Sequence, residues 1–213
     1  MTWTEKLYTH LIETYGTNEP IFLSEINVPG MRAAHVRQQM KKLTEDGRVK
    51  RFDTGIYYLP KKTLFRSGSY LSVDAVIQKK YLMDGNVRCG YISGMLFANQ
   101  LGLTAQVPAI YEVYSNKATT EYRETRLSGI KIILRKPYVE ISDSNAVQLQ
   151  FLDLLKEVSE ISELQGDELK EHLLVYMRSK NMDFDTLKPY LPYYPDRIYK
   201  NMYESGLLNG VSA

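Results

Sequence analysis

The chain has very little cysteine and tryptophan and no long hydrophobic run. Its 213 residues include one cysteine, Cys89, and one tryptophan, Trp3. A single thiol excludes an intramolecular disulfide framework and is typical of a reducing compartment, so a cytoplasmic protein is expected. No apolar stretch reaches the roughly 20 residues that a membrane-spanning helix needs, and residues 1–16 carry acids among their apolar residues. Neither a transmembrane helix nor a signal peptide is therefore predicted.

Metal-ligating residues are few and widely spaced. The three histidines, His10, His35 and His172, lie far apart in the sequence, and Cys89 has no second cysteine at CxxC spacing. Zinc sites are marked in sequences by pairs of such residues a few positions apart. No metal site is predicted, and Cys89 is expected to be a buried structural thiol rather than a nucleophile.

Phosphate-binding and catalytic patterns are missing as well. Gly90, Gly94 and Gly102 form neither GxxxxGK[ST] nor GxGxxG, so close packing of helices explains them better. The acidic pair at 167–168 stands at a predicted helix start, where the helix dipole favours carboxylates. No catalytic group and no cofactor are predicted.

Positive charge is concentrated in one segment. The whole chain has a net charge of +2, whereas residues 31–62 contain nine basic and three acidic residues, a net charge of +6. The net charge is +4 over residues 1–66, +3 over residues 67–141 and −5 over residues 142–213. A local basic excess attracts phosphates, since each neutralised phosphate releases condensed counterions. We therefore expect the first half of the chain to bind nucleic acid.

Residues 21–45 have the pattern of a short strand followed by helices. The apolar stretch 21–23 precedes Ser24, a residue type that favours helix starts. Val36, Met40 and Leu43 follow at the spacing of one helix face, which predicts an amphipathic helix. Together with a helix expected over residues 2–15, this predicts a core of three helices.

A β-hairpin is predicted directly after that helix. Short β-type segments at 49–52 and 56–59 flank the turn residues 53–55, which include a glycine where positive φ is expected. Helices followed by a hairpin are typical of the winged variant of the helix-turn-helix, so residues 1–66 are predicted to form a winged-helix DNA-binding domain. The alternative, an ordinary solvated helix with surface lysines, does not explain why helix, hairpin and charge coincide.

The helix face opposite the apolar one supplies the predicted contacts to double-stranded DNA. Its angular position, at about 100° per residue, selects residues 34, 35, 38, 41 and 42, with residue 37 on the flank. Gln38 suits a paired contact to adenine, His35 a purine and Ala34 a thymine methyl group. The cations of the helix and of the hairpin suit phosphates or the minor groove. The predicted interface comprises Arg32, Ala34, His35, Arg37, Gln38, Lys41, Lys42, Arg48, Lys50 and Arg51.

The remainder, residues 67–213, is predicted as a second domain, which makes the whole chain α+β. Its boundary is placed at the break Ser67-Gly68-Ser69. An antiparallel sheet followed by C-terminal helices is expected. Helices are predicted over residues 73–83, 90–99, 145–158, 167–178 and after Pro195, and strands over residues 109–114, 125–127 and 130–135, the last two joined by a Ser128-Gly129 turn.

Several short motifs follow one another in the middle of the chain. They are GYISG at 90–94, GLT at 102–104, QVP at 106–108, SNK at 115–117 and ILRKP at 133–137. In the first domain, VRQQM at 36–40 and GIYYLP at 55–60 accompany them. With these motifs, residues 5–140 resemble the AbiEi-type antitoxin family of abortive-infection toxin–antitoxin systems.

The resemblance implies a winged-helix autorepressor that binds inverted repeats in its own promoter, joined to a C-terminal domain needed for antitoxicity. It implies a co-encoded, nucleotidyltransferase-like toxin that is counteracted without a stable complex, a type IV arrangement in phage defence. It also places basic residues on the central sheet as a second candidate surface for nucleic acid: Arg123, Arg126, Lys131, Arg135 and Lys136. The acidic segment 153–171 departs from that basic character.

Two other functional classes stay open at this point. One is a winged-helix transcriptional regulator whose C-terminal domain senses a ligand or oligomerises, with no toxin partner. The other is a nucleic-acid-processing enzyme with a site that no motif marks. Because no catalytic constellation is found, a non-enzymatic protein is expected.

Overall fold

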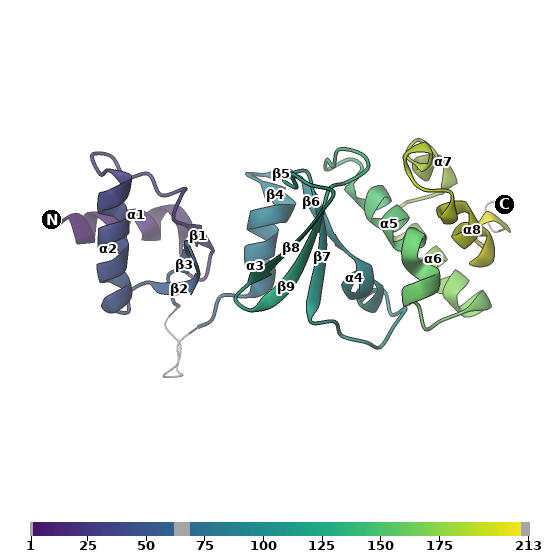
Figure 1. Ribbon diagram of the computed structural model, residues 1–213, viewed down its shortest axis with the longest axis horizontal. Coiled ribbons are helices and arrows are strands. Elements are labelled where there is room, and N and C mark those ends of the chain that lie inside the picture. The colour runs from purple at the N-terminus through teal and green to yellow at the C-terminus, as the bar shows by residue number, and fades with distance from the viewer. Residues whose placement is uncertain (1, 62–68, 210–213) are drawn as a thin grey trace. The chain divides into compact units, whose positions relative to one another are not determined.

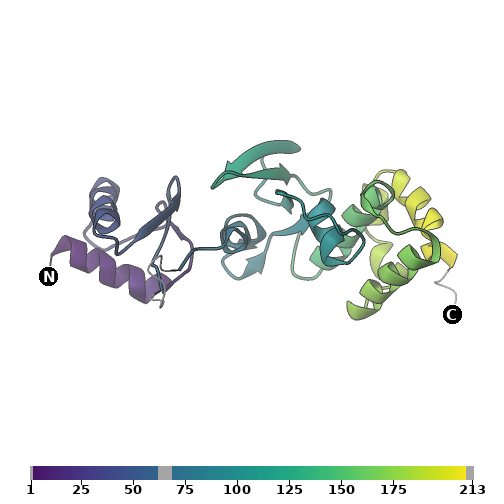
Figure 2. The ribbon, with the colours of Figure 1, turned by 90° about the horizontal axis from the view of Figure 1, so that it is seen from below.

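The computed structural model describes residues 2–61 and 69–209, which form an α+β structure. The chain divides into two compact units, Met1–Lys79 and Lys80–Ala213. Figures 1 and 2 show both units, and each is described here by itself.

The first unit combines two long helices with a small sheet. The order of its three strands is β1-β3-β2, and both pairings are antiparallel. Thr2 caps the first helix, since its Oγ1 accepts a hydrogen bond of 3.2 Å from the backbone N–H of Glu5. The elements are α1 (Trp3–Tyr15), β1 (Ile21–Phe22), α2 (Ala33–Glu45), β2 (Lys50–Asp53) and β3 (Ile56–Tyr58).

The expected core of three helices is wrong. Ser24 begins no helix: residues 23–25 form a turn, closed by a hydrogen bond of 2.9 Å from Glu25 N to Phe22 O. A proline at 29, which disfavours helical backbone at the residue before it, breaks the segment that follows. The side chains of Ile26, Val28 and Met31 nevertheless join the core from this irregular segment. They bury apolar surface without a middle helix.

The hairpin and the inner face of α2 match their predictions. Val36, Met40 and Leu43 are buried in one cluster with Leu7 and Leu11 of α1. The two hairpin strands meet at a turn in which Gly55 has a φ of 73°, a conformation that suits glycine.

The first of the two compact units ends at Lys79. The expected boundary at 66–67 falls outside the described residues. The Lys79 ammonium, in the π-helix η1 (Gln78–Leu82) after α3 (Val73–Ile77), donates to Pro20 O at 2.8 Å and pairs with Glu25 at 2.9 Å. Ser69 Oγ donates to Asn18 Oδ1 at 2.5 Å. These contacts tie Ser69 and Lys79 to the loop and turn around β1 in the first unit.

The second unit is built on a four-stranded sheet in the order β6-β7-β9-β8. The predicted hairpin is present, since Leu127 pairs with Ile130 across the turn. The prediction of an antiparallel sheet is wrong in one place, because β9 rather than β8 lies beside β7 and runs parallel to it. The elements are β4 (Met83–Asp84), β5 (Val87–Arg88), β6 (Gly90–Ser93), α4 (Gly94–Gln100), β7 (Ile110–Ser115), β8 (Tyr122–Leu127), β9 (Ile130–Arg135), α5 (Ala146–Ile161), α6 (Gly166–Ser179), α7 (Phe184–Leu187), η2 (Leu191–Tyr193), α8 (Arg197–Glu204) and η3 (Leu207–Asn209).

The helix predicted over residues 90–99 is also partly wrong. Residues 90–93 form β6, and the helix begins only at Gly94. A side chain at Gly90 would bring its Cβ to 2.4 Å from Tyr81 O and 2.7 Å from Tyr114 O. Gly90 therefore lets two backbone segments approach each other, which is a property of a strand rather than of a helix.

The helices of the second unit cover one half of the sheet. Helices α4 and α5 pack on β6 and β7, beside which they lie in Figure 1. Helices α7 and α8 pack on α5. Helix α5 is buried on most sides, with Phe151, Leu152, Leu154 and Leu155 in its core. In the part of the chain that the structure describes, no helix combines the length and the apolar character needed to cross a membrane.

Candidate nucleic-acid interface

The outward face of α2 carries the predicted contact residues of the helix. Its inner face is fixed by the apolar cluster and by a hydrogen bond of 2.7 Å from Thr4 Oγ1 to Gln39 Oε1. Buried Gln39 is thus an additional inward residue that periodicity did not predict. Of the predicted contact residues in this segment, those that are exposed are Arg32, just before the helix, and Ala34, Arg37, Gln38, Lys41 and Lys42 on it.

The cations on this face are little engaged within the protein. Lys41 lies 3.8 Å from Glu45, and both side chains are more than half exposed, so the pair is weak. Among the described residues, no carboxylate pairs with Arg32, Arg37 or Lys42. Their charges therefore remain available for an external anion.

His35 is the least exposed of the predicted contact residues on α2. Its ring is half-buried and meets the ring of Trp3 edge-on, with centroids 5.4 Å apart. It lies at the border between the outward face of α2 and the start of α1.

The cations of the hairpin differ in their exposure to solvent. Arg51 is exposed, and its guanidinium lies over the hairpin turn, donating to Asp53 O at 3.2 Å and Thr54 Oγ1 at 3.0 Å. Lys50 is half-buried with its ammonium 5.6 Å from the centre of the Tyr70 ring. Both lie on the predicted wing. Lys61, which follows it in the sequence, is exposed, and Lys62 lies outside the described residues.

Arg48 is engaged inside the first unit. Its guanidinium donates to Glu5 at 2.9 Å, lies 3.4 Å from Asp46 and covers the Tyr8 ring. The hydrogen bond to Glu5 is the main cause that raises the pKa of Arg48. Its charge is therefore largely satisfied by contacts between α1 and the end of α2, unlike the charges of Lys41 and Lys42.

The second candidate surface does not gather all its residues on one face. The strand registers place Arg126, Lys131 and Arg135 on one side of the sheet and Arg123 on the other. Lys136 follows the end of β9. Arg126 donates to Gly129 O at 3.0 Å within its own hairpin.

Carboxylates pair with some cations of this second surface, closely with Lys131 and Arg135 and, as for Lys41, only weakly with Lys136. Lys131 pairs with Glu124 at 2.7 Å, and Lys136 lies 3.9 Å from Glu121. Arg135 pairs with Glu112 in a partly buried contact. Because of these pairs, Lys131 and Arg135 present less unpaired positive charge to a phosphate than the cations of α2 do.

A buried polar network in the second unit was missed in the sequence. Asp153 and Lys156 of α5 are 1% and 5% exposed, and Lys156 Nζ lies 3.0 Å from Asp153 Oδ1. Tyr91 donates to Asp153 at 2.5 Å, and Lys156 donates to Tyr114 at 2.5 Å. Asp153 was assigned to an acidic segment, and the structure corrects this, because the side chain lies in the core.

Burial determines the titration of this network. It raises the pKa of Asp153, against the opposing effect of the Lys156 charge. It also raises the pKa of Tyr91 and Tyr114, in part because Asp153 is adjacent. The sequence signal was the stretch FLDLLKEV at 151–158, in which three charged residues, Asp153, Lys156 and Glu157, stand among apolar ones. The network joins α5 to β6 and β7.

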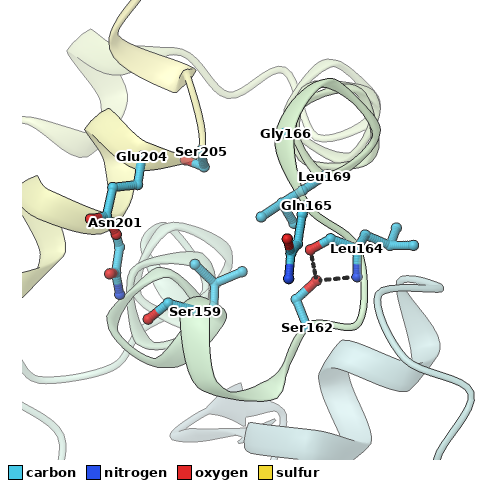
Figure 3. Close-up of a pocket in the computed structure, with 10 residues that line it drawn as sticks. Ser159, Ser162, Leu164, Gln165, Gly166, Leu169, Asn201, Glu204 and Ser205 are labelled. Atoms are coloured by element: carbon cyan, nitrogen blue, oxygen red, sulfur yellow. Dashed lines mark hydrogen bonds between the residues drawn. The ribbon is translucent and has the colours of Figure 1, made fainter.

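A pocket of about 350 Å³ lies at the ends of three helices in the second unit. Figure 3 shows Ser159 and Ser162 from the end of α5, Gln165 before α6, and Asn201 with Glu204 on α8. The Asn201 amide donates to Leu155 O at 2.7 Å, which fixes its orientation. Hydroxyls, amides and one carboxylate suit a small polar molecule held by hydrogen bonds.

Potential metal ligands do not gather in the described part of the chain. No three histidine, cysteine, aspartate or glutamate side chains there come together as a metal site. Cys89 is buried, and burial raises the pKa of its thiol, so the thiolate that nucleophilic chemistry needs is disfavoured.

Comparisons with known proteins add no assignment. No family model matches the chain, and no curated protein matches it.

Proposed function

We propose that the chain is a non-enzymatic DNA-binding repressor, whose first unit is a winged helix with α2 as the recognition helix and β2–β3 as the wing. The observation that carries the proposal is the outward face of α2, where Arg37, Gln38, Lys41 and Lys42 are exposed beside one another. Cations fix such a helix on phosphates, and Gln38 supplies a base-edge contact. The turn at 23–25 takes the place of the middle helix.

We further propose that it acts as the antitoxin of a type IV toxin–antitoxin pair. The resemblance of residues 5–140 to AbiEi-type antitoxins supports this part. The second unit would then counteract a nucleotidyltransferase-like toxin without a stable complex, while the first represses the shared operon.

An electrophoretic mobility shift on the DNA upstream of its own coding sequence tests the DNA-binding part. The expected result is a shift that is lost when Gln38→Ala, Lys41→Ala and Lys42→Ala are combined. A matched triple variant on the sheet, Arg126→Ala with Lys131→Ala and Lys136→Ala, should keep the shift. Absence of a shift, or equal losses in the two triple variants, would contradict the proposal.

Growth rescue tests the antitoxin part separately. The triple variant of α2 should still rescue cells that express the neighbouring toxin gene, because the second unit is unchanged. The same cells should lose repression of an operon reporter. If the intact chain fails to rescue growth, the antitoxin assignment is wrong even where DNA binding holds.

The pocket at the end of α5 favours a second function, that of a ligand-sensing regulator with no toxin partner. A small polar molecule bound beside Ser159 and Asn201 should raise the melting temperature in a thermal-shift screen. The variant Ser159→Leu, which fills an exposed side of the pocket, should abolish that rise. A rise that persists in this variant would place the ligand elsewhere.

A further inference from the structure

Trp3 is an exposed indole that the structure holds in a fixed position. It is 45% exposed and does not belong to the apolar cluster formed by Leu7 and Leu11 of the same helix. Large aromatic side chains contribute most to stability when they are buried. A core role therefore explains the position of Trp3 poorly.

Three contacts position the ring. The Lys6 ammonium lies 5.1 Å from its centre and also donates to Pro29 O at 2.8 Å. The edge-on ring of His35 is the second contact, with centroids 5.4 Å apart. The third is Gly30, where a Cβ would stand 3.6 Å from the outer edge of the indole. Trp3 thus bridges the start of α1, the turn at 29–30 and the first turns of α2.

The indole extends the face that α2 presents. His35, its neighbour, stands between the exposed residues Ala34 and Gln38 on the predicted contact surface. The indole Nε1–H donates to no acceptor among the residues that the structure describes. The N–H of a partly exposed indole beside the Lys6 ammonium is suited to a phosphate oxygen, and the apolar ring is suited to a deoxyribose.

We propose that Trp3 is a DNA-contact residue that donates its indole N–H to a backbone phosphate of the duplex bound by α2. It also keeps His35 turned toward the groove, because it packs against the side of that ring. The inference rests on the proposed DNA-binding function and adds to it a contact from α1. Lys6, by orienting Trp3, is a positioning residue of the same surface.

The test uses the full chain and a mixed-sequence duplex at low salt. Trp3 is the only tryptophan, so its emission reports on this one position. Saturating unlabelled DNA should change that emission and reduce quenching by acrylamide. In anisotropy titrations with a labelled duplex, Trp3→Ala should weaken binding about tenfold and Trp3→Phe about threefold, since phenylalanine keeps the packing but lacks the donor.

A matched control separates this contact from a general effect of removing an aromatic ring. Tyr199 on α8 is 42% exposed, so Tyr199→Ala removes a similar exposed ring from the second unit and should leave the affinity unchanged. Thermal melts confirm that each variant is folded, and Trp3→Phe carries the test if Trp3→Ala is not. Binding with unchanged quenching and unchanged affinity of Trp3→Phe would overturn the inference and leave the proposed function standing. No binding by the intact chain would overturn both.

Discussion

The cations of α2 and those of the central sheet are similar in number but differ in what surrounds them. Arg37 and Lys42 project from a helix without a pairing carboxylate in the described residues, whereas Lys131 and Arg135 each meet a glutamate. A paired cation must give up its partner, or share it, before it can neutralise a phosphate. Local net charge in a sequence therefore counts cations on the sheet that carboxylates already pair, whereas Arg37 and Lys42 of α2 have no such partner among the described residues.

The cores of the two units also differ in how many charged side chains they contain. The first core is apolar apart from Gln39, which Thr4 satisfies. The second includes the charged residues Asp153 and Lys156. The second unit thus buries a pair of opposite charges in its core, whereas the core of the first unit contains no charged residue among those described.

The largest expected effect comes from breaking the buried pair. Lys156→Met leaves the Asp153 carboxyl group in the core without its cation, which should lower the free energy of unfolding by about 3–5 kcal/mol. Urea denaturation followed by circular dichroism measures this. Lys188→Met, an exposed lysine of the same unit, is the control and should change little.

A double variant sharpens that result. Asp153→Asn with Lys156→Met removes both charges, so it should lose less stability than Lys156→Met alone. A single variant that unfolds at the same urea concentration as the intact chain would show that the pair contributes nothing.

If pairing with carboxylates is what limits DNA binding by the sheet cations, removal of those carboxylates should increase it. Glu121→Gln with Glu124→Gln removes the partners of Lys136 and Lys131. In a background that carries Lys41→Ala and Lys42→Ala, it should strengthen binding to mixed-sequence DNA by about three- to tenfold at low salt. Anisotropy titration provides the measurement.

The control for this gain has the same change in net charge. Glu140→Gln with Glu168→Gln alters exposed residues outside the sheet and should give a smaller gain. Equal gains in the two variants would mean that pairing on the sheet is irrelevant and only total charge matters.

The smallest expected effect concerns the loop before β7. The Glu163 carboxylate accepts hydrogen bonds from Ala105 N and Thr104 Oγ1, both at 2.9 Å, and these lower its pKa. A lowered pKa in the folded state means stabilisation that is present above the unfolded-state pKa and is lost as the pH falls through the folded-state value. Glu163→Gln should thus lower the melting temperature slightly at pH 7, and the difference should vanish on acidification.

Glu140→Gln is the control for the pH series, because Glu140 is exposed and its carboxylate makes no such bonds in the described structure. A difference between Glu163→Gln and the intact chain that stays constant down to acidic pH would contradict the assigned role of the carboxylate.

Periodicity predicted those parts of the fold in which one face of an element is buried. The inner face of α2, the β2–β3 hairpin and the β8–β9 hairpin follow directly from their sequences. The middle helix of the first unit and the strand β6 did not. Ser24 is equally suited to a turn, and whether Gly90 lies in a strand depends on its distant neighbours Tyr81 and Tyr114.

The candidate site was predictable to the same extent. The angular position of Gln38, Lys41 and Lys42 follows from the helix alone, and all three are exposed. The pairing of Arg48 with Glu5 and the contact of Trp3 with His35 join residues far apart in the sequence. Such contacts depend on how α1 packs against α2, which no local pattern contains.

The salt dependence of DNA affinity tests the central claim most directly, namely that the exposed face of α2 binds the duplex backbone. Anisotropy titrations of the intact chain and of the Lys41→Ala, Lys42→Ala variant over a series of salt concentrations give the slope of log affinity against log salt. Loss of two phosphate contacts should reduce the magnitude of that slope by about two. An unchanged slope, with affinity equal to that of the intact chain, would contradict the account.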